Sequence, residues 1–181
     1  NYGGMIAIQT LWAGPWMVRV AGYTPLESAT GLFWINTTML VAFFIFGYIL
    51  PKITKLGLET MRLMKFGLPI SYLSLLVIII SGENAGVIHF TIYILTSIVL
   101  TLTQPAVALS FPTSLAGKSL TSFNLLIFVG TFIMQWGIGL VIDFCKFLGK
   151  GEVQSFQISF FVYLIICVLC YLYFILKNKS E

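Results

Sequence analysis

Five amide side chains lie within long apolar stretches of the sequence, where polar groups are rare. An amide offers two N–H donors and a carbonyl acceptor, so it can hydrogen-bond to a bound solute or to a neighbouring helix. In hydrocarbon such a group is costly unless it finds a partner. We therefore expect these side chains to point toward protein or water. They are Gln9, Asn36, Gln104, Asn124 and Gln135.

Two groups of polar and aromatic residues have helical spacing. Each group falls on one face of a helix, and each mixes amides with aromatic rings. One interpretation is a pair of cavity walls suited to a small polar or organic solute, and the other is hydrogen bonding between helices. For Trp16, which lies near the outer interface, a place in an aromatic belt is a further option. The groups are Gln9, Trp12 and Trp16, and Asn124, Phe128, Thr131 and Gln135.

Few other residues in the apolar stretches could do chemistry. No Asp, Glu, Lys or Arg lies deep in one, and the single histidine, His89, lies close to an end. Cys167 and Cys170 have CxxC spacing but no second pair and no histidine nearby, which favours a packing role. The sequence also has no His/Glu cluster and no glycine-rich phosphate loop. It therefore predicts neither an enzyme nor a bound cofactor or metal.

The composition is typical of an integral membrane protein. Of the 181 residues, 59% are hydrophobic and 9% are charged, whereas soluble domains contain about 25% charged residues. Ten basic and six acidic side chains cannot cover the surface of a soluble domain of this size. The basic residues lie between apolar stretches and form no stripe, so nucleic acid is not an expected partner. The expected surroundings are a lipid bilayer.

The sequence predicts an all-α membrane protein with six transmembrane helices in a single domain. A helix needs about 20 apolar residues to cross a bilayer, and in lipid each segment must satisfy its own backbone hydrogen bonds. Strands of a barrel would alternate apolar and polar residues, but residues 73–80 and 160–176 are apolar on every face. The predicted spans cover about residues 2–18, 28–50, 66–81, 87–109, 120–142 and 156–176, and a polar loop is expected from Asp143 to Gln154.

Charge asymmetry predicts the orientation of these spans. Seven basic residues fall on the side that includes the C-terminus, and three fall on the other side. The positive-inside rule therefore places the C-terminus in the cytoplasm. The seven are Lys52, Lys55, Arg62, Lys65, Lys118, Lys177 and Lys179, and the three are Arg19, Lys146 and Lys150.

Proline and glycine mark expected bends and contacts within the spans. Pro15 and Pro105 each interrupt a span, and such breaks either allow a helix to bend or fix a static kink. Gly130, Gly137 and Gly139 in the fifth span are expected to permit close contact between helices.

Three stretches, residues 9–16 (QTLWAGPW), 47–52 (GYILPK) and 122–143, carry a resemblance to one family of membrane proteins. They resemble the second half of a major facilitator superfamily transporter, near its bacterial nitrate/nitrite porter branch. Residues 9–16 resemble the seventh helix of such proteins. Residues 47–52 (GYILPK) stand where the family has a Gly-x-x-x-Asp-Arg loop after the eighth helix, and residues 122–143 resemble the eleventh helix. The cytoplasmic loop motif would comprise Gly47, Lys52 and Lys55, but Pro51 stands where the motif carries its Asp.

The resemblance implies a function as well as a fold. It implies transport of a small-molecule solute by alternating access, in a bacterial inner membrane, against an N-terminal six-helix half that is missing from this sequence. The substrate cavity would be lined by Gln9, Trp12, Asn36, Gln104, Asn124, Thr131 and Gln135. The alternative is a non-transporting membrane scaffold or a truncated transporter fragment.

Overall fold

The computed structural model describes residues 1–55 and 59–177, and every element in this part of the chain is a helix. Five segments are long and apolar enough to cross a membrane. The expectation of an all-helical protein with membrane-length apolar segments is confirmed. The five are α3 (Pro25–Lys55), α4 (Thr60–Ser81) with the short turn η2 (Gly82–Asn84), the composite of α5 (Val87–Thr96), η3 (Ser97–Leu102) and α6 (Thr103–Leu109), α7 (Thr113–Phe147) and α8 (Glu152–Lys177).

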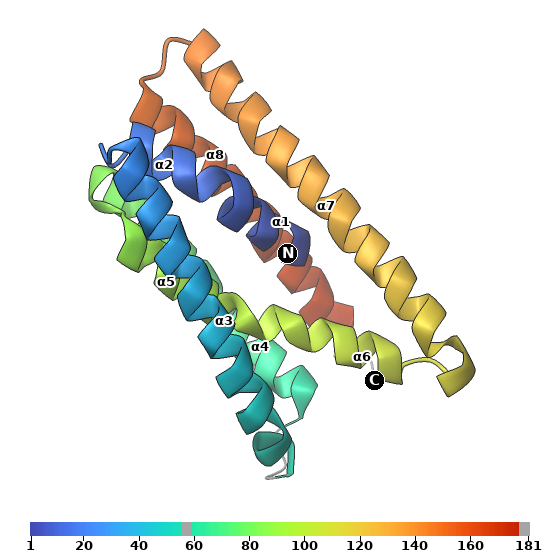
Figure 1. Ribbon diagram of the computed structural model, residues 1–181. Helices are drawn as coiled ribbons and strands as arrows, with labels where there is room; N and C mark the ends of the chain where they lie inside the picture. The colour runs from blue at the N-terminus through green and yellow to red at the C-terminus, as the bar shows by residue number, and fades with distance from the viewer. Residues whose placement is uncertain (56–58, 178–181) are drawn as a thin grey trace.

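The first predicted span, residues 2–18, has a different construction. It consists of α1 (Tyr2–Ala7), a π-helical turn η1 (Ile8–Trp12) and α2 (Ala13–Arg19), and it is not among the five segments of membrane-crossing character. Figure 1 shows this interrupted segment between α3 and α7. Several of its side chains are fully buried by the surrounding helices. The prediction of six spans is therefore confirmed for five of them.

The helices extend beyond the predicted spans, so the predicted loop before the last span is shorter than expected. α7 continues through Asp143 to Phe147, and α8 begins at Glu152, which leaves only residues 148–151 between them. The prediction of a loop from Asp143 to Gln154 was wrong at both ends. Apolar length sets how much helix lies in lipid, but a helix continues into water where its polar residues are solvated. Residues 56–58 of the charged connection before α4 lie outside the described residues.

The start of α3 illustrates this extension beyond the apolar stretch. Pro25 is its first residue, a position where the missing N–H of proline costs nothing. Glu27 Oε2 accepts hydrogen bonds of 2.8 Å from the backbone N and from Oγ1 of Thr24, and the Glu27 N–H donates to Thr24 Oγ1 at 3.2 Å. This reciprocal arrangement satisfies backbone donors that the first turn would otherwise leave unpaired.

The fourth predicted span contains a change of helix type at its centre. The 3₁₀ segment η3 separates α5 from α6 and ends three residues before Pro105. Proline has no N–H to complete the helical ladder, so a tighter turn before it accommodates the lost bond. The Thr101 and Thr103 hydroxyls donate to the carbonyls of Ile98 and Leu100, at 2.7 and 2.6 Å. The predicted break is therefore present but begins earlier in the chain.

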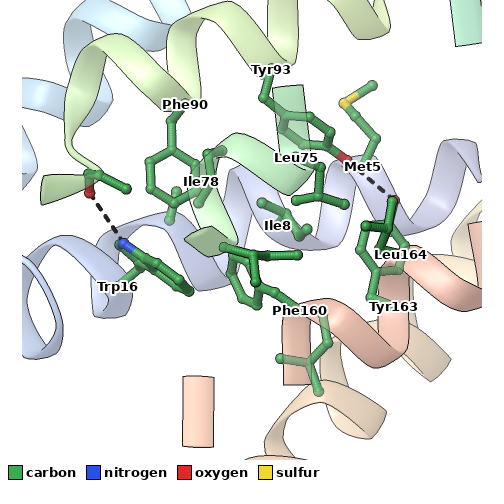
Figure 2. Close-up of a cluster of buried hydrophobic side chains, with 14 of the residues drawn as sticks. Met5, Ile8, Trp16, Leu75, Ile78, Phe90, Tyr93, Phe160, Tyr163 and Leu164 are labelled. Carbon is green, nitrogen blue, oxygen red and sulfur yellow. Dashed lines mark hydrogen bonds between the residues drawn. The ribbon is translucent and has the colours of Figure 1, made fainter. Parts of the chain in front are cut away.

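The core lies where α2, α5 and α8 meet around Trp16. This side chain has no exposed surface, and its Nε1 donates to the carbonyl of Ala85 at 3.1 Å (Figure 2). Its ring centroid lies 4.7 Å from that of Phe160, with Phe90 and Phe156 at 6.2 and 6.1 Å. The aromatic-belt option for Trp16 was wrong, because the side chain packs inward and its polar atom is satisfied within the protein.

A second polar contact in the same core joins two tyrosines. The hydroxyls of Tyr93 and Tyr163 are 3.3 Å apart and link α5 to α8 (Figure 2). Both side chains are buried, so each hydroxyl satisfies part of the hydrogen-bonding demand of the other. Aromatic packing and hydrogen bonds between helices of the bundle thus hold the core together.

The basic residues of the described chain gather at the ends of helices. The end of α3, the start of α4, the turn from α6 to α7 and the end of α8 lie toward the same end of the bundle (Figure 1). Six of the seven basic residues assigned to the C-terminal side lie in or next to these elements, and Lys179 lies outside the described residues. Which end faces the cytoplasm stays a prediction.

Candidate functional site

The π-helical turn η1 positions two neighbouring polar side chains toward different helices. A π-helix hydrogen-bonds from residue i to i+5, so each turn holds more residues than an α-helical turn and rotates the residues after it about the helix axis. Gln9 reaches α3, where its Nε2 donates to Asn36 Oδ1 at 2.8 Å and contacts Met39 Sδ at 3.1 Å. The next residue, Thr10, reaches α7. The turn therefore connects the first segment to both of its neighbours.

The contacts to α7 involve one residue twice. Gln135 Nε2 donates to Thr10 Oγ1 at 3.1 Å, and the backbone carbonyl of Gln135 accepts from Trp12 Nε1, also at 3.1 Å. The Thr10 hydroxyl in turn donates to the carbonyl of Ile6 at 2.7 Å. Gln135 is thereby fixed in position through both its side chain and its backbone.

These amides keep hydrogen-bonding capacity after their protein contacts are made. Asn36 donates from Nδ2 to the carbonyl of Leu32 at 2.7 Å, and Gln135 donates once from Nε2. Each amide nitrogen carries two N–H groups, so each retains one. Gln9 is 7% exposed, whereas Asn36 is exposed and Gln135 is partly exposed. Asn36 and Gln135 can thus hydrogen-bond to a molecule outside the bundle. Gln9 is buried and fixes the position of Asn36 through its hydrogen bond to Asn36 Oδ1.

A pocket of about 390 Å³ lies beside this group, between η1 and α7. Its volume is within the range of about 300–1,000 Å³ typical of small-molecule sites. The lining combines aromatic rings with a few polar groups. It includes Trp12, Phe132, Gln135, Trp136, Gly139 and Asp143.

The structure separates the seven predicted cavity residues into two sets. Four of them form two pairs on either side of η1: Gln9 contacts Asn36 of α3, and Trp12 contacts Gln135 of α7. Thr131 hydrogen-bonds to the carbonyl of Ile127 in its own helix. Gln104 lies partly exposed in α6 and Asn124 is exposed in α7, and neither side chain hydrogen-bonds to another described residue. Their role as cavity residues stays a prediction.

The cytoplasmic loop motif requires a correction. Gly47, Lys52 and Lys55 lie in the last turns of the continuous helix α3, not in a loop. Lys52 Nζ lies 3.9 Å from the centroid of the Tyr48 ring, a contact between residues i and i+4 that a helix provides. This contact and the apolar run before it favour continued helix despite Pro51.

Sequence reasoning missed Thr10, Met39 and the two glycines at the start of α1. A Cβ on Gly3 would lie 2.6 Å from the backbone N of Thr131, so α1 and α7 are in backbone contact there. The pair Gly3-Gly4 next to an apolar run was an available signal, because small residues mark close helix contacts in membrane proteins. Thr10 gave no such signal, since its partner depends on the π-turn.

The glycine predictions in α7 have mixed outcomes. Gly130 lies against Gly3, and Gly139 lies against an edge of the Trp12 ring, so both permit close contact as expected. At Gly137 a Cβ would meet nothing within 4 Å, so the prediction of a helix contact there was wrong. Gly137 is partly exposed, and the space beside it is open.

Comparison with known proteins finds no matching family model, no matching curated protein and no matching solved structure. The function of the chain is therefore inferred from its own geometry.

Proposed function

We propose that this chain is the C-terminal half of a secondary transporter that moves a small solute across a membrane by alternating access. The observation that carries the proposal is the pair of hydrogen bonds made by adjacent residues of η1. Gln9 binds Asn36 of α3, and Thr10 binds Gln135 of α7. Polar groups gathered at a helix break inside a membrane bundle are typical of solute sites in transporters.

The broken helices supply a second line of support for the proposal. The first segment changes from α to π and back, and the α5–η3–α6 segment changes from α to 3₁₀ and back. Non-helical or altered backbone at membrane depth is tolerated where it lines a cavity or is buried in protein. Such breaks also give places at which a helix can bend as the site opens to one side and then to the other.

The proposed mechanism needs an opposing surface. α3 and α7 expose long apolar faces, with Phe44 73% exposed and Phe128 72% exposed. In the proposal an N-terminal six-helix half covers the parts of α3 and α7 that carry Asn36 and Gln135, and lipid covers the rest. The two halves rock about the site between them. On this proposal the membrane is a bacterial inner membrane and the C-terminus is cytoplasmic.

Substitution of the amides tests the proposal directly. We expect Gln9→Met and Gln135→Met each to lower the initial rate of solute uptake about tenfold, because each removes amide hydrogen bonds worth about 1.4 kcal/mol in total. The measurement is uptake of a broad solute panel into proteoliposomes that contain the full-length protein, with and without an imposed pH gradient.

A matched control is Gln154→Met, because Gln154 is an exposed amide in the first turn of α8 and away from η1. The Gln154→Met protein should have the same initial rate of solute uptake as the unaltered protein. If folded Gln9→Met and Gln135→Met proteins take up solute at the normal rate, these amides only connect helices and do not act in transport. If the folded full-length protein moves no solute, the scaffold or fragment alternative replaces the proposal.

A further inference from the structure

The pocket between η1 and α7 has a chemical polarity along its length. Gln135, Gly139 and Asp143 follow one another at intervals of four residues, so they lie on one face of α7. At 1.5 Å per residue, the amide and the carboxylate are about 12 Å apart along the helix. The pocket therefore has an amide at one end and a carboxylate at the other.

Aromatic rings fill the space between these polar ends. An edge of the Trp12 ring lies against Gly139, where a Cβ would come 3.3 Å from Cζ2 and 3.4 Å from Cη2 of the ring. Trp136 and Phe132 complete the wall and are 63% and 68% exposed. Because Gly139 has no side chain, the indole can lie against the helix backbone and form part of the pocket wall. The middle of the pocket thus presents aromatic surface to any molecule inside it.

Two cations near this end of α7 form ion pairs with a carboxylate other than the exposed Asp143. Lys146 Nζ and Arg19 Nη1 both contact Glu152 Oε1, at 2.7 and 3.6 Å. Within residues 1–55 and 59–177, no cation forms an ion pair with Asp143. A carboxylate in a pocket lined by indole rings attracts a cation and repels an anion by its charge, and the negative face of an indole ring attracts a cation that lies over it.

We propose that this pocket binds a lipophilic organic cation, such as a substituted ammonium ion with an aromatic or alkyl group. The ammonium group would lie near Asp143 and the faces of Trp12 and Trp136, and the apolar group would extend toward Gln135. That this cation is also the transported solute rests on the proposed function. The binding site itself does not depend on transport.

The test measures binding first and transport second. Radiolabelled benzyltrimethylammonium is the probe, and its binding to the full-length protein in detergent is measured by equilibrium dialysis. We expect benzenesulfonate, an anion of similar size, not to compete. Asp143→Asn should weaken binding about tenfold or more because it removes the charge and keeps the shape. Gly139→Ala should also weaken binding, because the added methyl group displaces the Trp12 ring.

The matched control is Glu83→Gln, because Glu83 is an exposed carboxylate in η2 that does not line the pocket. It should leave binding unchanged. Binding that is equal in Asp143→Asn and the unaltered protein, or competition by benzenesulfonate, would overturn the site. If binding depends on Asp143 but the cation is not taken up into proteoliposomes, the site stands and the proposed transport fails. If the protein takes up another solute but does not bind the cation, the proposed transport stands and the cation site fails.

Discussion

Substituting Trp16 with alanine is expected to lower the free energy of unfolding by about 3–5 kcal/mol, the usual cost of removing a fully buried large aromatic side chain. Trp16 has no exposed surface and contacts rings from both α5 and α8. Its removal would leave a cavity at the point where these helices meet α2. The measurement is reversible unfolding by SDS in mixed micelles, followed by circular dichroism.

A graded variant separates packing from hydrogen bonding at this position. Trp16→Phe keeps an aromatic ring but leaves the Ala85 carbonyl without the indole donor, so a smaller loss of about 1–3 kcal/mol is expected. Trp34, which is 58% exposed in α3, is the control, and its replacement by alanine should change stability by less than about 0.5 kcal/mol. Equal losses for Trp16→Ala and Trp34→Ala would show that Trp16 does not hold the core together.

Substituting Gly3 with alanine is the second change with a large expected effect. The added Cβ would lie 2.6 Å from the Thr131 backbone N, 2.7 Å from the Ile127 carbonyl oxygen and 2.8 Å from the Gly130 carbonyl carbon. All three are backbone atoms of α7, so no side chain can rotate away and the helices must separate. We expect a loss of about 2 kcal/mol or more, even though alanine is intrinsically favoured over glycine in a helix by about 1 kcal/mol.

The control for Gly3→Ala uses the same substitution on the facing helix. At Gly137 a Cβ would meet nothing within 4 Å, so Gly137→Ala should leave stability unchanged or raise it slightly. Both variants are compared in the same SDS titration, together with the amount of folded protein recovered from the membrane. The close contact of α1 and α7 would be contradicted by a Gly3→Ala protein as stable as the unaltered one.

The π-turn explains why the helical spacing of Gln9, Trp12 and Trp16 was misleading. Regular α-helical spacing places all three on one face. In the structure Gln9 reaches α3, Trp12 reaches the backbone of α7, and Trp16 points into the core. Because residues 8–12 are π-helical, the side chains beyond the turn are rotated away from an ideal α-helical face. No residue type in the turn predicts a π-helix.

The second predicted face, from Asn124 to Gln135, is a regular part of α7 and keeps its spacing. Its members nevertheless have different surroundings, because α1 crosses α7 near Gly130 and covers only part of the face. Asn124 is exposed, whereas Gln135 contacts Thr10. Spacing predicts which residues share a face of one helix, but the crossing point of a second helix decides which of them gain a partner.

The sequence by itself determined that the protein is helical and suited to a membrane. Its long apolar segments lack the alternation of barrel strands, and a helix then satisfies the backbone hydrogen bonds within each segment in lipid. It also determined that amides, and no charged side chains, lie deep within the apolar stretches. Only the tertiary structure decided which amides meet and where Trp16 points. It also placed Asp143 within a helix, on the wall of an aromatic pocket. These outcomes depend on the rotation of each helix about its axis and on where helices cross, and both are set by packing between residues far apart in the chain.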